Sequence, residues 1–334
     1  MARLFTWSSA EERNKINAYA LEVNGLTKHF ANHRALQEVD FTVQQGNIHG
    51  FLGPNGAGKT TAIKIILGLI PATAGRVKVL GEPLVYGKNL RYLQHTNYLP
   101  QDPVFPEGLT GKEALGLVAD IYKLPYRASR KRLMKLLGYF QLEDAANRKV
   151  GAYSRGMQQR LGLAAVLLTE PKLMILDEPV SALDPEGRRR VLEIISRLKG
   201  RATVFFSSHI LADVERVCDH VTIIDRGRKL LQISTRELLN RYAMEQYLVS
   251  VRPDQRREAA AIIKQHQAVR EVAPHLDKLL IISEPGEAVA MAEEMIPVLI
   301  NRGIVVTEFM QNRTDLEEAF FKVLEENHRG GEVK

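Results

Sequence analysis

The chain has 334 residues, enough for about two domains, and its 45% hydrophobic and 25% charged residues are typical of a folded protein. This composition excludes a disordered chain, a collagen-like repeat and a polar low-complexity protein. The formal net charge of +7 is uneven, with +11 up to Glu245 and −4 from Gln246 onward. A basic first part suits nucleotide phosphates, nucleic acid or anionic lipid headgroups, and charge alone does not choose among them.

We expect this chain to stay in the cytoplasm, where it is made. Its single cysteine, Cys218, cannot form an internal disulfide, which favours a reducing compartment. The longest uncharged stretches, such as 65–75 and 202–212, are shorter than the ~18 apolar residues that span a bilayer. Residues 1–19 lack the order of a signal peptide, so we interpret them as an N-terminal extension.

The first part of the chain predicts strands that alternate with helices, and therefore a parallel core sheet. The predicted strands are 21–23, 39–44, 48–52, 173–176 and 203–207. The predicted helices are 60–69, 112–122, 127–140, 156–168 and 185–198. Three of the helices lie in a helix-rich block at about 110–169, which we expect to be a subdomain of a larger domain at 20–240.

A second domain is predicted at 246–334, with the boundary between 239 and 246. Its elements are strand 247–251, helix 254–266, strands 269–273 and 278–282, helix 287–302 and strand 304–310. This βαββαβ order is the ferredoxin-like arrangement. A last helix, 314–326, is expected to begin with a capping box formed by Thr314 and Glu317.

A phosphate-binding loop is predicted between the strand 48–52 and the helix 60–69. The residues that match the pattern G-x-x-x-x-G-K-[ST], with the threonine after it, are Gly53, Pro54, Asn55, Gly56, Ala57, Gly58, Lys59, Thr60 and Thr61. Glycines let backbone N–H groups surround a polyphosphate, and the following helix adds its positive end. We expect Lys59 to reach the β- and γ-phosphates and Thr60 to bind Mg²⁺.

Two adjacent acids follow the apolar strand 173–176. The end of a parallel strand places carboxylates at the ligand edge of the sheet. We expect Asp177 to hold the Mg²⁺ shell and Glu178 to orient or deprotonate an attacking water. An acid pair after an apolar run is otherwise an ordinary strand exit, and the loop upstream favours the catalytic interpretation.

A third motif begins the helix 156–168, with Ser154 placed as its N-cap. The residues Tyr153, Ser154, Arg155, Gly156, Met157 and Gln158 resemble the Leu-Ser-Gly-Gly-Gln signature of the nucleotide-binding subunits of ABC transporters, with Ser154 and Gly156 kept and Arg155 and Met157 departing from it. The variant Tyr-Ser-x-Gly-Met is similar to that of the exporter subfamily that pairs with type-two ABC permeases.

Further residues resemble motifs of the same family in the same order. Gln101 resembles the Q-loop glutamine that meets Mg²⁺ and the attacking water, and Ser181 and Asp184 lie in a D-loop-like segment. His209 resembles the switch histidine that contacts the γ-phosphate, and Phe30 resembles the aromatic residue that stacks on adenine. A lone residue of any of these types is more often a surface or core residue, so the order of the motifs carries the resemblance.

The resemblance implies an α/β P-loop NTPase fold, the ABC cassette, with a parallel core sheet, antiparallel N-terminal strands, a helical subdomain and a small ferredoxin-like C-terminal domain. It implies an ATPase that uses ATP and Mg²⁺ and forms a homodimer in which Ser154 and Gly156 of one copy close over ATP on the other. It also implies a transmembrane permease as partner, peripheral attachment to the cytoplasmic side of the cell membrane, and no nucleic acid.

Two alternatives remain open at this point. A soluble ABC ATPase that acts on ribosomes or nucleic acid is favoured by the basic first part, although the chain has no second cassette and no RNA-binding signature. Basic residues also cluster at 127–132 and 188–190, and such clusters are usually solvated faces. The first cluster would instead lie near anionic lipid headgroups if the helical block faced a membrane.

Overall fold

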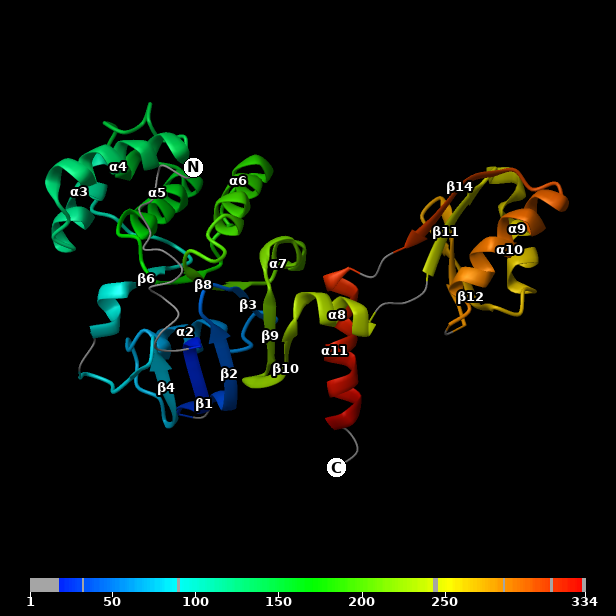
Figure 1. The fold of residues 1–334 in the computed structure, drawn as a ribbon, viewed down its shortest axis with the longest axis horizontal. Helices are drawn as coiled ribbons and strands as arrows, with labels where there is room; N and C mark the ends of the chain where they lie inside the picture. Colours follow the sequence, from blue (N-terminus) through cyan, green and yellow to red (C-terminus); the bar gives the residue numbers. More distant parts are fainter. Residues whose placement is uncertain are drawn as a thin grey trace. The chain divides into compact units, whose positions relative to one another are not determined.

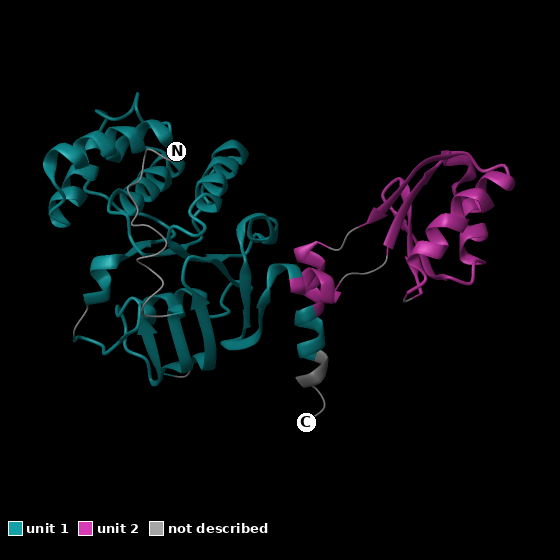
Figure 2. Ribbon diagram, viewed as in Figure 1, with its two compact units in different colours: residues 1–236, 323–334 teal, residues 237–322 magenta. Residues whose placement is uncertain are grey.

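The computed structural model describes residues 18–31, 33–88, 91–242, 246–284, 286–312 and 315–331. The chain forms two compact units, one of residues 1–236 with 323–334 and one of residues 237–322 (Figure 2). Most of the predicted N-terminal extension and the predicted cap at Thr314 lie outside the described residues. None of the helices in the described ranges has both the length and the hydropathy needed to cross a bilayer.

An antiparallel sheet opens the first unit. Its strands, in the order β2-β1-β4-β5, are β1 (Tyr19–Phe30), β2 (His33–Gln44), β4 (Ala74–Val79) and β5 (Glu82–Pro83). β1 and β2 are far longer than the predicted strands 21–23 and 39–44. Register shifts interrupt their pairing near Gly25, whose φ is 60°, and these shifts break the alternation of side chains that would have revealed the full strands.

The second sheet of this unit carries the predicted site at the carboxyl ends of its parallel strands. In spatial order it consists of β10 (Arg228–Ser234), β9 (His220–Asp225), β3 (Ile48–Leu52), β8 (Thr203–Ser208), β7 (Leu173–Asp177) and β6 (Thr96–Leu99). All neighbours pair in parallel except β10, which runs antiparallel to β9. The carboxyl ends of β3, β7 and β8 therefore meet at one edge.

The two sheets pack on each other through aromatic residues. Phe41 of β2 lies 5.2 Å from Phe51 of β3 and 5.6 Å from Phe205 of β8, measured between ring centroids. All three side chains are buried, at no more than 2% exposure. Because Phe51 is two residues before Gly53, this packing fixes the strand from which the phosphate-binding loop begins.

Helices complete the first unit and confirm the predicted α/β class. They are α2 (Lys59–Ile66), α3 (Gly111–Ile121), α4 (Tyr126–Tyr139), α5 (Arg155–Leu168), α6 (Pro185–Ser196), α7 (Leu211–Val217) and α8 (Thr235–Tyr242), the last crossing into the second unit. The helices α3, α4 and α5 gather in the predicted helical block (Figure 1). Thr110 and Glu113 form a capping box at the start of α3.

The second unit has an antiparallel sheet in the order β12-β13-β11-β14, as the predicted ferredoxin-like arrangement requires. Its elements are β11 (Gln246–Val251), α9 (Arg256–Lys264), β12 (Val269–His275), β13 (Lys278–Ser283), α10 (Ala288–Asn301) and β14 (Val306–Asn312). The chain ends with α11 (Leu316–Gly331). The end of α11 belongs to the first unit, where His328 Nε2 lies 3.0 Å from Asp225 Oδ2 at the end of β9.

Candidate active site

The phosphate-binding loop needs glycine at two positions for steric reasons. A Cβ on Gly53 would lie 2.3 Å from the carbonyl oxygen of Ile224, and one on Gly58 would lie 2.6 Å from that of Ala35. Gly58 also has a φ of 106°, which side chains rarely adopt. The loop thus lies directly on neighbouring strands, with Asn55 and Gly56 exposed at its tip.

Helix α2 begins at the end of this loop without a side-chain cap. Its first-turn N–H groups therefore remain available to an anion, which is the usual arrangement for binding phosphate. Thr61 lies in that first turn. Pro54 and Ala57 shape the loop, with Ala57 N donating to Pro54 O at 3.2 Å and Gly227 N donating to Ala57 O at 3.0 Å.

Lys59 is folded back onto the loop. Its Nζ donates to the carbonyl oxygens of Gly53 at 2.7 Å and Pro54 at 3.1 Å. Burial lowers the pKa of Lys59, and the carboxylates of Glu178 and Asp177 act in the opposite direction. The ammonium group is thus partly desolvated and bonded to neutral carbonyls, so a phosphate oxygen would be a stronger partner than either.

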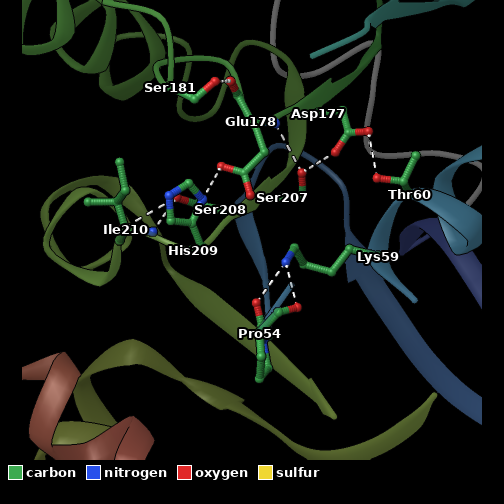
Figure 3. A network of polar contacts seen from close by, with 11 residues as sticks. Pro54, Lys59, Thr60, Asp177, Glu178, Ser181, Ser207, Ser208, His209 and Ile210 are labelled. Carbon is green, nitrogen blue, oxygen red and sulfur yellow. Dashed lines mark hydrogen bonds and ion pairs between the residues drawn. The ribbon is translucent and has the colours of Figure 1, made fainter. Parts of the chain in front are cut away.

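Asp177 joins the loop helix to the next strand (Figure 3). Its Oδ2 accepts from Thr60 Oγ1 at 3.0 Å, and its Oδ1 accepts from Ser207 Oγ at 2.5 Å. The carboxylate is 2% exposed. Burial, and to a lesser extent the charge of Asp177, raises the pKa of Tyr98 to about 12.

Glu178 and His209 form the second half of this network (Figure 3). His209 Nδ1 lies 2.8 Å from Glu178 Oε2, and because a carboxylate only accepts, this ring nitrogen carries the proton in the contact. The backbone of Glu178 has a φ of 50°, and its N–H donates to Ser207 Oγ at 3.0 Å. The left-handed turn sends the carboxylates of Asp177 and Glu178 in different directions from one strand end.

The site fits a magnesium ion. Thr60 Oγ1 and Asp177 Oδ2 lie together and are both oxygen ligands of the kind that Mg²⁺ prefers. Among the described residues no group of three or more His, Cys, Asp or Glu side chains forms a metal cage. A Mg²⁺ ion here would therefore take most of its ligands from phosphate oxygens and water, as is usual for this ion with nucleotides.

The signature-like residues lie apart from this polar network. Ser154 is the N-cap of α5, with its Oγ accepting from Met157 N at 3.2 Å, and both Ser154 and Arg155 are exposed. Gly156 and Gln158 are half-buried. No hydrogen bond between described residues joins these five to the phosphate-binding loop.

The D-loop-like segment lies between the signature-like helix and the acid pair. Ser181 Oγ donates to Glu178 O at 3.1 Å, and Asp184 caps α6 by accepting from Gly187 N at 3.1 Å. A Cβ on Gly156 would lie 3.2 Å from Ala182 O, so the two segments approach closely.

Gln101 and Phe30 are exposed at the ends of their strands. Gln101 follows β6 and forms no hydrogen bond with the described residues. Phe30 ends β1, is 45% exposed, and has Lys28 Nζ at 4.8 Å from its ring centroid. Both side chains are therefore free to meet a ligand.

The sequence reasoning missed Ser207. Its hydroxyl is fully buried and bonds both Asp177 and the N–H of Glu178, so it holds the two acids in place. A serine at the end of an apolar strand gives no signal, and only the parallel register that pairs Asp177 with Ser207 reveals it.

Comparisons with known proteins identify the family of the chain. The ABC transporter family model matches residues 36–181. An uncharacterised ABC transporter ATP-binding protein of Bacillus subtilis is 34% identical over 310 residues, covering 91% of this chain and 99% of that protein. The chain belongs to the ABC transporter ATP-binding proteins.

Two further relatives support this family assignment. The bacitracin transport ATP-binding protein of Bacillus licheniformis is 33% identical over 307 residues, covering 91% of this chain and 97% of that protein. The solved ATP-binding subunit of an ABC transporter has a TM-score of 0.61 and 34% identity, covering 67% of this chain and 93% of the other. The protein is thus an ABC transporter ATPase that binds ATP through its cassette.

Proposed function

We propose that this ABC transporter ATPase powers an exporter, with two copies closing head to tail over ATP at the cytoplasmic face of a separate permease. The observation that carries the proposal is the division of the site within one chain. Lys59, Asp177, Glu178 and His209 converge at one sheet edge, whereas the exposed Ser154 has no bond to them. A second copy would supply the missing face.

The hydrolytic step follows from the positions of the acids. Glu178 would take the proton of a water that attacks the γ-phosphorus as the bond to the ADP oxygen breaks, and His209 would orient its carboxylate. Lys59 would hold β- and γ-phosphate oxygens, Thr60 and Asp177 would hold Mg²⁺, and Gln101 would meet the water and the metal. The ion, when bound, neutralises charge on the phosphate oxygens.

An apolar groove beside Gln101 supports the permease partner. It has a volume of about 240 Å³ and is lined by residues of β6, α3, α5 and the loop between, among them Pro100, Val104, Val118 and Tyr122. Val104 is 90% exposed. An exposed aliphatic side chain beside a concave apolar surface favours a protein segment as its partner.

The direction of transport comes from the signature-like residues 153–157, which are similar to those of an exporter subfamily. The bacitracin transport relative supports a transport role by analogy. Because the permease selects the cargo of an ABC transporter, no cargo is proposed.

The dimer is tested by mixing two inactive variants. Lys59→Ala removes the phosphate contact and Ser154→Arg blocks the signature-like face, so each homodimer should be inactive. A mixed dimer has one site in which both residues are native, and ATPase activity should return on mixing. A shared site would be contradicted if activity stayed absent on mixing. It would also be contradicted if wild-type ATPase activity stayed proportional to protein concentration down to dilutions at which ultracentrifugation shows only monomer.

The permease is tested in membranes. The wild-type chain should copurify and crosslink with a polytopic membrane protein, and Val104→Asp should weaken that association while leaving ATP binding unchanged. Recovery with ribosomes instead would support the alternative ATPase class.

A further inference from the structure

Helix α4 has an outward face that combines basic and apolar side chains. Its inner side is buried through Ser129, Leu133, Leu136 and Leu137. The exposed side chains on the other side are Tyr126, Arg127, Arg130, Lys131, Met134 and Lys135, which we call the basic face of α4. Their spacing of one, three and four residues makes one continuous helix surface.

This face has no acidic side chain to balance its charge. Residues 121–142 contain six basic residues and no acidic one. Among the described residues no acid pairs with the four cations of the basic face. By contrast, Arg132 on the flank of the same helix is half-buried and forms an ion pair with Glu170.

The other basic cluster of the cassette is neutralised. On α6, Arg188 Nε lies 2.7 Å from Asp213 Oδ1, and Arg189 and Arg190 each lie within 4 Å of a glutamate one turn away. The unpaired cations are therefore a property of α4 and not of arginine-rich helices in this protein generally.

Apolar groups are interleaved with these charges. The side chain of Tyr126 is 69% exposed and that of Met134 is 42% exposed. The guanidinium of Arg130 lies 6.0 Å from the Tyr126 ring centroid and donates to its hydroxyl at 2.9 Å. A helix face that mixes cations, an aromatic ring and an unbranched apolar chain is typical of contact with a lipid interface.

We propose that the basic face of α4 binds the phosphate headgroups of anionic phospholipids. This inference goes beyond the proposed function, because it gives the ATPase a membrane contact that needs no permease. It takes from the proposed function only which side of the ATPase faces the membrane. Tyr122, which lines the apolar groove, precedes α4 by four residues. A permease segment in the groove would therefore bring this helix towards the surrounding bilayer.

The lipid is favoured over nucleic acid by the apolar residues. Cations alone would suit either lipid headgroups or the phosphate backbone of a nucleic acid. The side chain of Met134 and the ring edge of Tyr126, however, would bury little apolar surface against a phosphate backbone. At a bilayer surface both enter the headgroup region while the cations remain among the phosphates.

The test is sedimentation of the full chain with vesicles of phosphatidylcholine, with and without phosphatidylglycerol, at about 0.15 M salt. The wild type should bind only the anionic vesicles. The triple variant Arg127→Gln, Lys131→Gln, Lys135→Gln should bind roughly 100-fold more weakly, at about 5-fold per charge removed near an anionic surface. All three positions are exposed, so equal ATP binding checks that the fold is kept.

A matched control removes the same charge elsewhere. The variant Arg76→Gln, Lys229→Gln, Arg236→Gln changes three exposed cations of the same unit and should bind vesicles almost as the wild type does. Equal loss in both triple variants, or no loss in the α4 variant, would overturn the proposal. Tighter binding of bulk transfer RNA than of anionic vesicles, dependent on the α4 cations, would also overturn it and assign the face to nucleic acid.

Discussion

Replacing Ser207 by alanine should remove the two hydrogen bonds that hold Asp177 and Glu178 to strand β8. The hydroxyl donates to Asp177 at 2.5 Å and accepts from the N–H of Glu178 at 3.0 Å, and it has no exposure to water. The bond to the carboxylate contributes about 1.5–3 kcal/mol and the bond from the amide about 0.5–1.5 kcal/mol. Water cannot replace either, so the free energy of unfolding should fall by about 2–4.5 kcal/mol.

The substitution should also weaken Mg²⁺ binding at the candidate site. Among the described residues Asp177 would then keep only Thr60 as a side-chain hydrogen-bond partner, and we expect a higher Mg²⁺ concentration for half-maximal ATPase activity. Urea unfolding is followed by circular dichroism and by loss of fluorescent-nucleotide binding, which isolates the unit that contains the site.

The next residue provides the control for this experiment. Ser208 is also buried, but its hydroxyl bonds only within its own turn, accepting from Ile210 N at 2.9 Å. Ser208→Ala should cost about 1 kcal/mol and leave the Mg²⁺ dependence unchanged. The reasoning would be refuted if Ser207→Ala lost no more stability than Ser208→Ala and hydrolysed ATP with the same Mg²⁺ dependence as the wild type.

The remaining predictions concern the general base, the loop glycine, a buried histidine and the C-terminal unit. Glu178→Gln should bind nucleotide normally but turn over at least ~10²-fold more slowly, because the amide accepts no proton; single-turnover hydrolysis at wild-type speed would remove Glu178 from the mechanism. Gly53→Ala should lose nucleotide binding, measured by equilibrium titration, because its Cβ would lie 2.3 Å from the Ile224 oxygen; normal binding would show that the strand can move aside. Burial, and then the charge of a neighbouring histidine, lower the pKa of His49 to about 3 from 6.5. Below pH 6.5 the unfolded state therefore binds more protons than the folded state, so the free energy of unfolding falls as the pH falls. Between pH 7 and pH 5 the wild type should lose about 2 kcal/mol of stability that His49→Gln does not lose, as urea unfolding at both pH values would measure. Replacing 246–312 by a flexible linker should leave ATP binding near normal and weaken dimerisation or permease-coupled activity, whereas loss of ATP binding in a folded variant would show that this unit contributes to the site.

Much of the candidate site was predictable because its chemistry lies on adjoining residues. Lys59 and Thr60 follow a glycine loop at a strand-to-helix junction, and Asp177 ends a fully buried strand that Glu178 follows directly. Ser207 was not predictable, since its role depends on β8 lying beside β7. Strand order is a property of the tertiary fold and leaves no local pattern in the sequence.

Helices and strands were predictable where the spacing of apolar and polar residues is regular, and they were missed where that spacing is interrupted. The βαββαβ order of the second unit followed from short alternating segments. The strands β9 and β10 were missed, although β9 pairs directly with β3, and β1 was predicted at a quarter of its 12 residues. The return of α11 to the first unit brings His328 to Asp225, 103 residues earlier in the chain, and no window of the sequence can show such a contact.

That return has a consequence for the order of synthesis. The first unit is almost complete when Arg236 leaves the ribosome, but its last piece begins at Val323. At 5–20 residues per second the synthesis of residues 237–322 takes roughly 4–17 s, during which Asp225 at the end of β9 lacks its contact with His328. The residues of the second unit are thus synthesised before the first unit has all of its own residues. A stop codon within residues 323–334 would therefore act on the nucleotide-binding unit, even though every residue of its candidate site had already been made.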